Sequence, residues 1–302
     1  MNILESLQEI LDKTQIYIDE PMSKHTTFQA GGKAKYFVLP ETIEQLSDVI
    51  MLCHTTKLPF AVIGRGSNLL VSDKGYDGVI ISMTKGFLGL KVENETIHVD
   101  GGVILEKVSN AAIENALTGL EFAYGIPGTI GGAIVMNAGA YDGEMSKIVK
   151  EVVVLDHQNI VRTLKKEELD FDYRHSCIKK ERMIVLRAIL QLEKGNQEVI
   201  RTKTMQFMQM RTDKQPLTYP SAGSTFKRPQ NHFAGKLIME ASLAGKQIGG
   251  AQVSTKHCGF IINKDHATAS DIYALIQYVI EKVFENANVR LEPEVQFLGD
   301  FT

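Results

Sequence analysis

The sequence predicts an α+β protein built of two or three lobes. The chain has 302 residues, and at roughly 100–200 residues per domain this length allows two or three domains. Segments with helical periodicity and segments with strand periodicity alternate irregularly, with hairpins between them, whereas a single doubly wound sheet would alternate regularly. Hydrophobic residues make up 44% of the chain and charged residues 23%, which is typical of a soluble globular protein.

The N-terminal region predicts a short amphipathic helix over residues 3–13, followed by a β-α-β unit. Apolar residues at Ile43, Leu46 and Val49, continued by Ile50 and Cys53, have the spacing of one helical face, which predicts a helix over 42–57. Strands are predicted on either side, over 36–40 and 59–64. Such a unit favours parallel strands with a right-handed crossover.

The rest of the chain predicts more strands and helices of ordinary length. Before Pro216 we expect a strand at 79–83, hairpins at 90–93/96–100 and 152–156/160–163, helices at 104–117 and 197–211, and a strand at 183–193. After it we expect helices at 234–241 and 270–285 and strands at 259–263 and 289–298. Pro216 and the polar run before it, residues 212–215, mark the best domain boundary.

Composition excludes several classes of protein. The 33 basic and 36 acidic residues give a net charge of −3, and no dense run of Lys or Arg indicates a nucleic-acid partner. The three cysteines are odd in number and far apart, which argues against a disulfide framework or a cysteine zinc site and fits a reducing cytosol. We expect no metal.

Neither a secretory signal nor a membrane span is expected. The first residues carry Glu5, Glu9 and Asp12 instead of a basic region followed by an apolar one. Residues 122–141 are uncharged, but their many glycines and Pro127 disfavour a membrane helix, and we expect buried loop and turn backbone there. The expected location is the cytoplasm.

Two glycine-rich loops are candidates for binding a phosphate or a flat cofactor. The first follows a predicted strand and comprises Gly64, Arg65, Gly66, Ser67, Asn68 and Leu69. It lacks the third glycine of the Rossmann pattern and the Gly-Lys-Ser/Thr of a Walker loop. The second comprises Gly125, Ile126, Pro127, Gly128, Thr129, Gly131 and Gly132 around Ile130. Glycines allow close approach of main-chain N–H groups to an anion, although tight structural turns would explain the same residues.

Three further segments carry polar side chains suited to catalysis or binding. Tyr173 and Arg174 follow an acidic stretch. Ser224 lies on a glycine-flanked loop close to Lys227, and nearby positive charge stabilises a developing anion. Near the C-terminus Glu292 and Glu294 would share one face of the predicted strand. Each segment also has a purely structural explanation, as a salt bridge, a structural turn or a solvated strand.

Read together, these segments resemble the UDP-N-acetylenolpyruvoylglucosamine reductase family. The resemblance extends over nearly the whole chain, and it includes residues 27–32, 136–141, 221–227, 249–251 and 291–295 besides the two glycine-rich loops and Tyr173-Arg174. About 50 residues separate Arg174 from Ser224, so the chain is similar to the shorter family type, which lacks an extra tyrosine-bearing segment. Arg228 departs from the pattern, since some members have Asn after the Phe-Lys pair.

The resemblance implies a fold and a domain organisation. It implies a p-cresol methylhydroxylase-type FAD-binding half of two subdomains, with residues 1–82 and 295–302 in the first and 83–212 in the second. A C-terminal α+β substrate-binding domain would span 213–294. The two glycine-rich loops would hold FAD without a covalent link, because neither contains a histidine.

It also implies an activity and residue roles. NADPH would reduce UDP-N-acetylglucosamine enolpyruvate to UDP-N-acetylmuramate through FAD, in cytoplasmic peptidoglycan precursor synthesis. Ser224 would donate the proton, while Arg174 and Glu294 would polarise and stabilise the intermediate. Tyr173, Lys227 and Asn137 would bind substrate. Two alternatives stay open, namely an oxidase of a small alcohol or sugar with the same FAD fold, and a flavin- or nucleotide-sugar-binding regulator without turnover.

Overall fold

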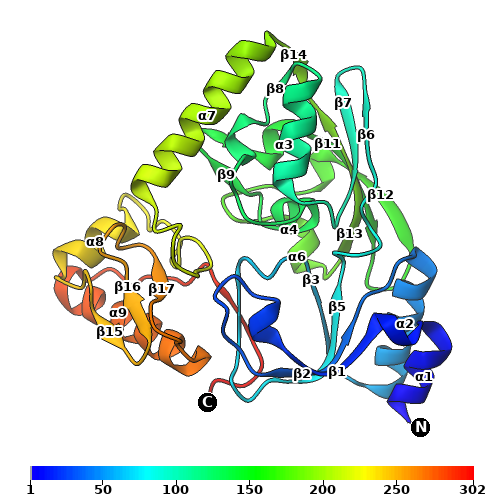
Figure 1. Cartoon of the computed structure of the whole chain (residues 1–302), viewed down its shortest axis with the longest axis horizontal. Helices are drawn as coiled ribbons and strands as arrows, with labels where there is room; N and C mark the ends of the chain where they lie inside the picture. The colour runs from blue at the N-terminus through cyan, green and yellow to red at the C-terminus, as the bar shows by residue number, and fades with distance from the viewer. Residues whose placement is uncertain (1) are drawn as a thin grey trace. The chain divides into compact units, whose positions relative to one another are not determined.

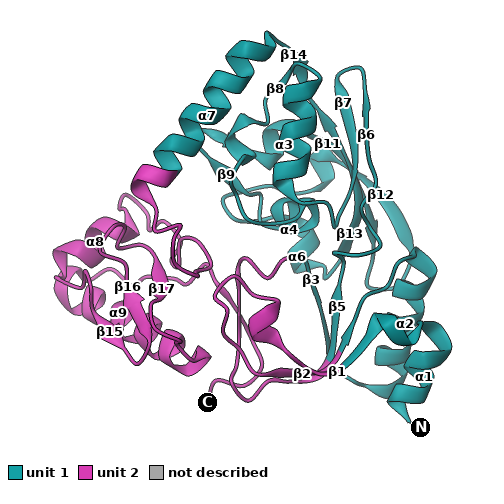
Figure 2. Cartoon of the chain, viewed as in Figure 1, with its two compact units in different colours: residues 1–17, 37–64, 79–211 teal, residues 18–36, 65–78, 212–302 magenta. Residues whose placement is uncertain are grey.

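The computed structural model describes residues 2–302 and divides into two compact units (Figures 1 and 2). Unit 1 consists of residues 1–17, 37–64 and 79–211, and unit 2 of residues 18–36, 65–78 and 212–302. The chain therefore passes between the units several times. The three-part domain division expected from the sequence stays a prediction.

Unit 1 contains a five-stranded antiparallel sheet with the order β12-β11-β13-β7-β6 (Figure 1). Its strands are β6 (Leu90–Glu93), β7 (Thr96–Asp100), β11 (Val149–Leu155), β12 (Val161–Lys165) and β13 (Ile184–Gln191). Both predicted hairpins are confirmed. The apolar residues that alternate along β7, β11 and β13 pack with α3 (Leu105–Glu114) and α4 (Ile130–Val135) into one buried core.

The predicted β-α-β unit has an inserted strand. The N-terminal sheet has the order β1-β2-β5-β3, with β1 (Ile16–Pro21), β2 (Lys33–Val38), β3 (Phe60–Ile63) and β5 (Tyr76–Ser82). The helix is confirmed as α2 (Ile43–Thr56), whose first turn is capped by the Thr42 hydroxyl. However, the strands that flank it are not neighbours, because β5 lies between them and pairs in parallel with β3.

Several short elements and most of one long helix complete unit 1. They are α1 (Ile3–Ile10), β8 (Leu117–Thr118), β9 (Gly139–Ala140), β10 (Gly143–Glu144), α5 (Met145–Ile148), α6 (Cys177–Lys180), β14 (Glu193–Lys194) and most of α7 (Gln197–Lys214). The glycine-rich segment expected to be loop contains α4, so that expectation is wrong for residues 130–135. The Thr129 hydroxyl caps this helix at the Gly132 N–H, and two glycines do not prevent so short a helix that is packed in the core.

Unit 2 is built around a small sheet and a long helix. The sheet has the order β15-β16-β17, formed by β15 (Gln247–Ile248), β16 (Ala251–Val253) and β17 (Ile261–Asn263). Helix α9 (Ala269–Ala287) and the shorter α8 (Ala234–Glu240) bury apolar faces in the core of this unit. A capping box between Thr268 and Asp271 begins α9, and Asn288 in the left-handed region ends it.

The predicted C-terminal strand is much shorter than expected. Only β18 (Gln296–Leu298) is strand, and it pairs in parallel with β4 (Leu69–Val71). Pro293 lacks an N–H group and makes only an isolated bridge to Phe226, so the ladder does not extend over 289–295. The expectation that Glu292 and Glu294 share a strand face therefore loses its basis.

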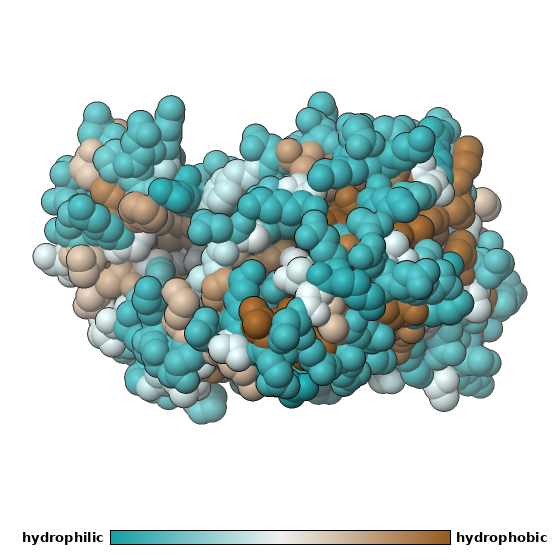
Figure 3. Space-filling model, turned by 90° about the horizontal axis from the view of Figure 1, so that it is seen from above, coloured by the Kyte–Doolittle hydropathy of each residue, from teal (hydrophilic) through white to brown (hydrophobic). Residues whose placement is uncertain are grey.

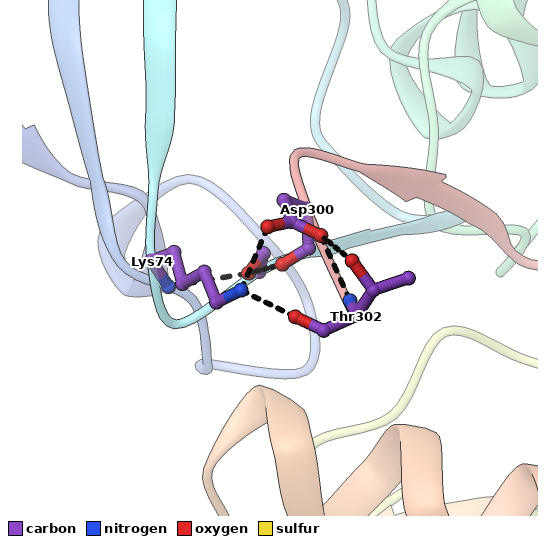
Figure 4. A network of polar contacts seen from close by, with 4 residues as sticks. Lys74, Asp300 and Thr302 are labelled. Carbon is purple, nitrogen blue, oxygen red and sulfur yellow. Dashed lines mark hydrogen bonds and ion pairs between the residues drawn. The ribbon is translucent and has the colours of Figure 1, made fainter.

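The C-terminus is tied down within unit 2 (Figure 4). The Lys74 Nζ lies 2.7 Å from Asp300 Oδ2, and the Thr302 N–H donates to Asp300 Oδ1 at 2.8 Å. The hydrogen bond from Lys74, with those from Thr302, holds the pKa of Asp300 well below its usual range. These contacts fix the segment that follows β18.

The surface is mostly polar on the face drawn in Figure 3, where apolar side chains form small separate groups. Within residues 2–302, no helix has both the length and the apolar character that a bilayer span requires.

Candidate functional site

The first glycine-rich loop follows β3 and presents main-chain N–H groups without protein partners. Within residues 2–302, the N–H groups of Arg65, Gly66, Ser67 and Asn68 donate to no protein acceptor. Gly66 is in the left-handed region, and a Cβ there would lie 2.1 Å from the carbonyl oxygen of His25, so only glycine fits. A run of free N–H groups on such a loop is suited to an anion.

The second loop begins at Gly125 and leads into α4. Its Gly128 and Thr129 N–H groups also have no protein acceptor within the described chain. The loop is pinned on its other side, because Ile130 N–H donates to the Val103 carbonyl at 2.9 Å and Gly131 N–H to the Gly101 carbonyl at 2.8 Å. The free groups are therefore presented on a fixed backbone.

Within unit 1, Gly64 packs against the second loop. A Cβ on Gly64, where the first loop begins, would lie only 2.4 Å from Thr129 Oγ1 in the second. Each loop by itself offers the main-chain donors and the close backbone approach that a phosphate or flat ring of a dinucleotide such as FAD needs. The residues present thus suit the cofactor that the sequence resemblance implies.

Arg174 lies in a tight turn in unit 1. Asp172 and His175 exchange main-chain hydrogen bonds of 3.1 and 3.2 Å, and Arg174 between them has a φ of 55°, which is uncommon for a residue with a side chain. Its guanidinium carbon lies 5.1 Å from the centre of the exposed Tyr173 ring. The turn thus presents a cation and an aromatic ring together.

Asn137 is buried and supports this turn. Its Nδ2 donates to the Asp172 carbonyl at 3.1 Å, and its Oδ1 accepts from the Ser146 N–H at 2.9 Å. The side-chain amide is therefore engaged with the main chain on both sides. These contacts favour a positioning role for Asn137, and its expected role in substrate binding stays a prediction.

In unit 2, a hydrogen bond brings the serine loop to the C-terminal glutamate. The Glu294 N–H donates to the carbonyl of Thr225 at 2.8 Å, and Lys227 N–H donates to the Glu292 carbonyl at 2.9 Å. Thr225 itself is fully buried, and its hydroxyl accepts from the Ile261 N–H at 2.9 Å. Ser224, the residue before it, is exposed on this fixed backbone.

Lys227 is paired with Glu292. Their side chains form a salt bridge, in which the Glu292 side chain is 68% exposed. The two glutamates therefore differ in their surroundings, because Glu292 pairs with a surface lysine whereas Glu294 is half-buried. Arg228 places its guanidinium carbon 4.1 Å from the centre of the Phe233 ring.

Asn68 connects the first glycine-rich loop with Glu294. Its Nδ2 donates to the Glu294 carbonyl at 3.1 Å, and its own carbonyl accepts from the Gln296 N–H at 2.9 Å. The Gln296 side chain donates to the same Glu294 carbonyl at 2.7 Å. A residue expected to bind the cofactor thus also fixes the backbone of a predicted catalytic residue.

Arg211 on α7 is buried, and a Cβ on Gly125 in the second loop would lie 3.3 Å from its Nε. Sequence reasoning missed both Arg211 and Thr225. Arg211 looks like an ordinary helical arginine in sequence, and Thr225 is hidden between Ser224 and Phe226 in the serine loop. No local pattern distinguishes a buried arginine from an exposed one near the end of a helix. The proximity of Thr225 to Ser224 was the only available signal.

The chain matches two family models. Residues 34–164 match an FAD binding domain, and residues 215–298 match the C-terminal domain of UDP-N-acetylenolpyruvoylglucosamine reductase. The reductase of that name from Clostridium botulinum is 48% identical over 99% of this chain and 97% of its own length. The one from Caldanaerobacter subterraneus is 46% identical over 99% of this chain and 98% of its own length.

Solved structures agree with these matches. The crystal structure of UDP-N-acetylenolpyruvylglucosamine reductase from Thermus caldophilus has a TM-score of 0.81 and 32% identity, covering 94% of this chain and 98% of its own. Phl p 4.0202, a glucose dehydrogenase, has a TM-score of 0.52 at 15% identity over 65% of this chain and 45% of its own, which shows a likeness of fold alone. The predicted fold class, with an FAD-binding part and a C-terminal domain, is confirmed.

Proposed function

The chain belongs to the UDP-N-acetylenolpyruvoylglucosamine reductase family, and we propose that Ser224, Arg174 and Glu294 carry out the chemistry in this member. It is an FAD-dependent oxidoreductase that reduces UDP-N-acetylglucosamine enolpyruvate to UDP-N-acetylmuramate, with NADPH as the reductant, in peptidoglycan precursor synthesis. The assignment of Ser224 and Glu294 is supported by the hydrogen bond that joins the serine loop to Glu294, and that of Arg174 by the turn that presents it beside Tyr173.

The two glycine-rich loops hold FAD in this proposal. The free N–H groups of residues 65–68, together with those of Gly128 and Thr129, would donate to its phosphates or ring. Gly64 must be glycine because Thr129 leaves no space for a side chain. Bound FAD supplies the hydride transfer that links NADPH to the enolpyruvyl carbon.

Ser224 donates the proton that completes the reduction. Hydride addition leaves negative charge on the neighbouring carbon of the substrate, spread into its carboxylate, and this carbon must be protonated. The Ser224 side chain is exposed and has no hydrogen-bond partner within residues 2–302, so its hydroxyl is available to a substrate. The buried Thr225 next to it keeps the backbone fixed.

Arg174 and Glu294 polarise the substrate and stabilise its developing charge. The permanently charged guanidinium of Arg174 suits a carboxylate, and the turn at 172–175 fixes its backbone. The Glu294 backbone is held by Thr225 and Asn68. Groups that are positioned before the reaction stabilise charge without reorganisation.

Substrate contacts are assigned to Tyr173, Lys227 and Asn137. Tyr173 is exposed beside Arg174. Lys227 carries a charge suited to a diphosphate or carboxylate, which would take the place of Glu292 as its partner when substrate binds. Asn137 would act mainly by supporting the turn that carries Arg174. Arg228 receives no role.

The working compartment and partners follow the same assignment. We place the enzyme in the cytoplasm, because its free cysteines Cys53, Cys177 and Cys258 suit a reducing compartment. Its partners are the enolpyruvyl substrate and NADPH, with no nucleic acid, membrane or metal. The three-part division, with FAD-binding subdomains and a substrate-binding domain over 213–294, remains part of this proposal.

Absorbance and turnover measurements test the function. The purified chain should be yellow, should release its flavin on acid precipitation, and should oxidise NADPH faster when the enolpyruvyl substrate is added. Colour retained in the pellet would contradict non-covalent binding. A yellow protein that does not respond to the substrate would be a binding protein or an oxidase instead.

A further inference from the structure

Arg211 carries a buried charge that no carboxylate within residues 2–302 balances. Its side chain is 6% exposed, and its Nε and Nη2 atoms are buried without a hydrogen-bond partner in residues 2–302. Burial lowers the pKa of Arg211, yet a guanidinium stays charged in proteins. An unpaired buried charge is costly, so its presence calls for an anion that the protein itself does not supply.

Another cation on the same helix has a carboxylate partner. Two turns before Arg211 on α7, Lys203 lies 3.6 Å from the carboxylate of the buried Glu121. Glu121 accepts further hydrogen bonds from the Thr118 hydroxyl and the Gly119 N–H. Among residues 2–302, no carboxylate forms a salt bridge with Arg211, and its Nε and Nη2 have no hydrogen-bond acceptor.

The surroundings of Arg211 place it at the second glycine-rich loop. A Cβ on Gly125 would lie 3.3 Å from both Cδ and Nε of Arg211. The guanidinium carbon lies 5.5 Å from the centre of the Tyr141 ring, which stacks on Phe207 at 4.6 Å. The Arg211 side chain therefore lies close to both the Tyr141 ring and the start of the second loop.

We propose that Arg211 binds the diphosphate of FAD. The oxidised flavin ring is neutral, whereas the diphosphate is always charged, so only the diphosphate balances a permanent cation throughout the catalytic cycle. A substrate diphosphate would balance it only while substrate is bound. Arginine suits this task because its planar fork donates two parallel hydrogen bonds to phosphate oxygens.

This inference rests on the FAD-binding function. Comparing variants with the wild type distinguishes a failure of that function from a failure of the role of Arg211. Arg211→Met keeps the length of the side chain and removes the charge, and Arg211→Lys keeps the charge without the fork. Arg201→Met is the matched control, because Arg201 is an exposed arginine on the same helix. FAD titration of the full-length chain after cofactor removal gives the dissociation constants. Failure of the wild type to bind FAD would refute both the function and the role of Arg211, whereas normal binding by the wild type with unchanged affinity in Arg211→Met would refute the role alone.

We expect Arg211→Met to weaken FAD binding by about 100-fold, Arg211→Lys to lie between it and the wild type, and Arg201→Met to match the wild type. The cofactor-free Arg211→Met protein should unfold at a temperature no lower than the wild type, since an unbalanced buried charge is gone. Riboflavin, which has no phosphate, should bind both equally.

Four results would overturn the proposal. Unchanged FAD affinity would leave Arg211 without a cofactor role, and lower stability of the cofactor-free variant with equal losses for FAD and riboflavin would make it structural. Weaker binding of UDP with unchanged FAD affinity would assign Arg211 to the substrate diphosphate. A shifted reduction potential with unchanged FAD affinity would place the charge at the flavin ring.

Discussion

The main-chain N–H of Glu294 donates to the carbonyl of Thr225 at 2.8 Å, and this contact fixes the serine loop to the C-terminal segment. It is flanked by the Phe226–Pro293 bridge and by the hydrogen bond from Lys227 N–H to the Glu292 carbonyl. The backbone segments that carry two proposed catalytic residues are therefore hydrogen-bonded to each other, although Ser224 and Glu294 are 70 residues apart in the sequence.

Replacing Ser224 with Ala should separate the two half-reactions. The hydroxyl is proposed to act only on the substrate, so reduction of FAD by NADPH should keep nearly its native rate. Reoxidation by the enolpyruvyl substrate should slow by about 10²- to 10⁴-fold, the range for general acids. Stopped-flow absorbance measures both steps, with Ser221→Ala as a control in the same loop. Equal slowing of both steps would make Ser224 a binding or folding residue.

Glu294 and Glu292 should respond differently to replacement by Gln. Glu294→Gln keeps shape but loses charge, so kcat should fall far more than substrate binding weakens. Glu292→Gln breaks only an exposed salt bridge with Lys227, an interaction worth about 0–1 kcal/mol, and should be close to neutral. Substrate-dependent NADPH oxidation by both variants checks this. The opposite ranking would refute the assignment of Glu294.

Gly132→Ala should stabilise the cofactor-free chain and weaken FAD binding. A Cβ at Gly132 meets only Thr129 Oγ1 at 3.7 Å, and Ala in a helix is more stable than Gly by about 0.5–1 kcal/mol. The added methyl group would still obstruct a cofactor at the exposed side of α4.

Gly64→Ala should weaken FAD binding and also lower stability, because its methyl group collides with Thr129. Thermal unfolding and FAD titration measure both effects. Unchanged FAD affinity in Gly132→Ala would move the cofactor away from α4.

Asn68→Ala should lower turnover of the FAD-loaded enzyme. The hydrogen bond to the Glu294 carbonyl stabilises the backbone of Glu294 by about 0.5–1.5 kcal/mol. If this energy is lost from the transition state, kcat falls by roughly 2- to 10-fold. Turnover is measured per bound flavin, so a change in FAD content does not enter the rate. A normal kcat per flavin with reduced FAD content would instead make Asn68 solely a cofactor residue.

His257 should make unit 2 sensitive to acid. Burial lowers the pKa of His257 below its usual 6.5, and its Nδ1 accepts from the Gly259 N–H at 3.1 Å, a bond that requires the neutral ring. The neutral ring contributes its full stability above the unfolded pKa, and this contribution is lost as the pH falls through the lower folded pKa. The loss is at most about 1.4 kcal/mol per pH unit below 6.5.

Urea unfolding at pH 7.5 and 5.5 checks this expectation. His257→Asn keeps an acceptor without a titrating ring and should reduce the difference between the two pH values. His157→Asn, at an exposed position, should leave that difference unchanged. If His257→Asn retained the full acid sensitivity, other groups would be responsible for it.

The sequence by itself determined the family, the cofactor loops and most elements. Helical spacing and a Thr cap predict α2, and strand alternation predicts both hairpins, because these patterns involve residues a few positions apart. Glycine content marked the loops at Gly64 and Gly128, since an unusual backbone requires an unusual residue.

Only the tertiary structure decided which distant groups meet. The Asn68 side chain contacts the Glu294 carbonyl across 226 positions, β5 inserts between β2 and β3, and Pro293 shortens the last strand by offering no N–H group. Arg211 is buried beside Gly125 without a partner, although nothing local distinguishes it from an exposed arginine. Burial and contacts between remote segments arise only when the whole core packs, so the local periodicity of the sequence does not predict them.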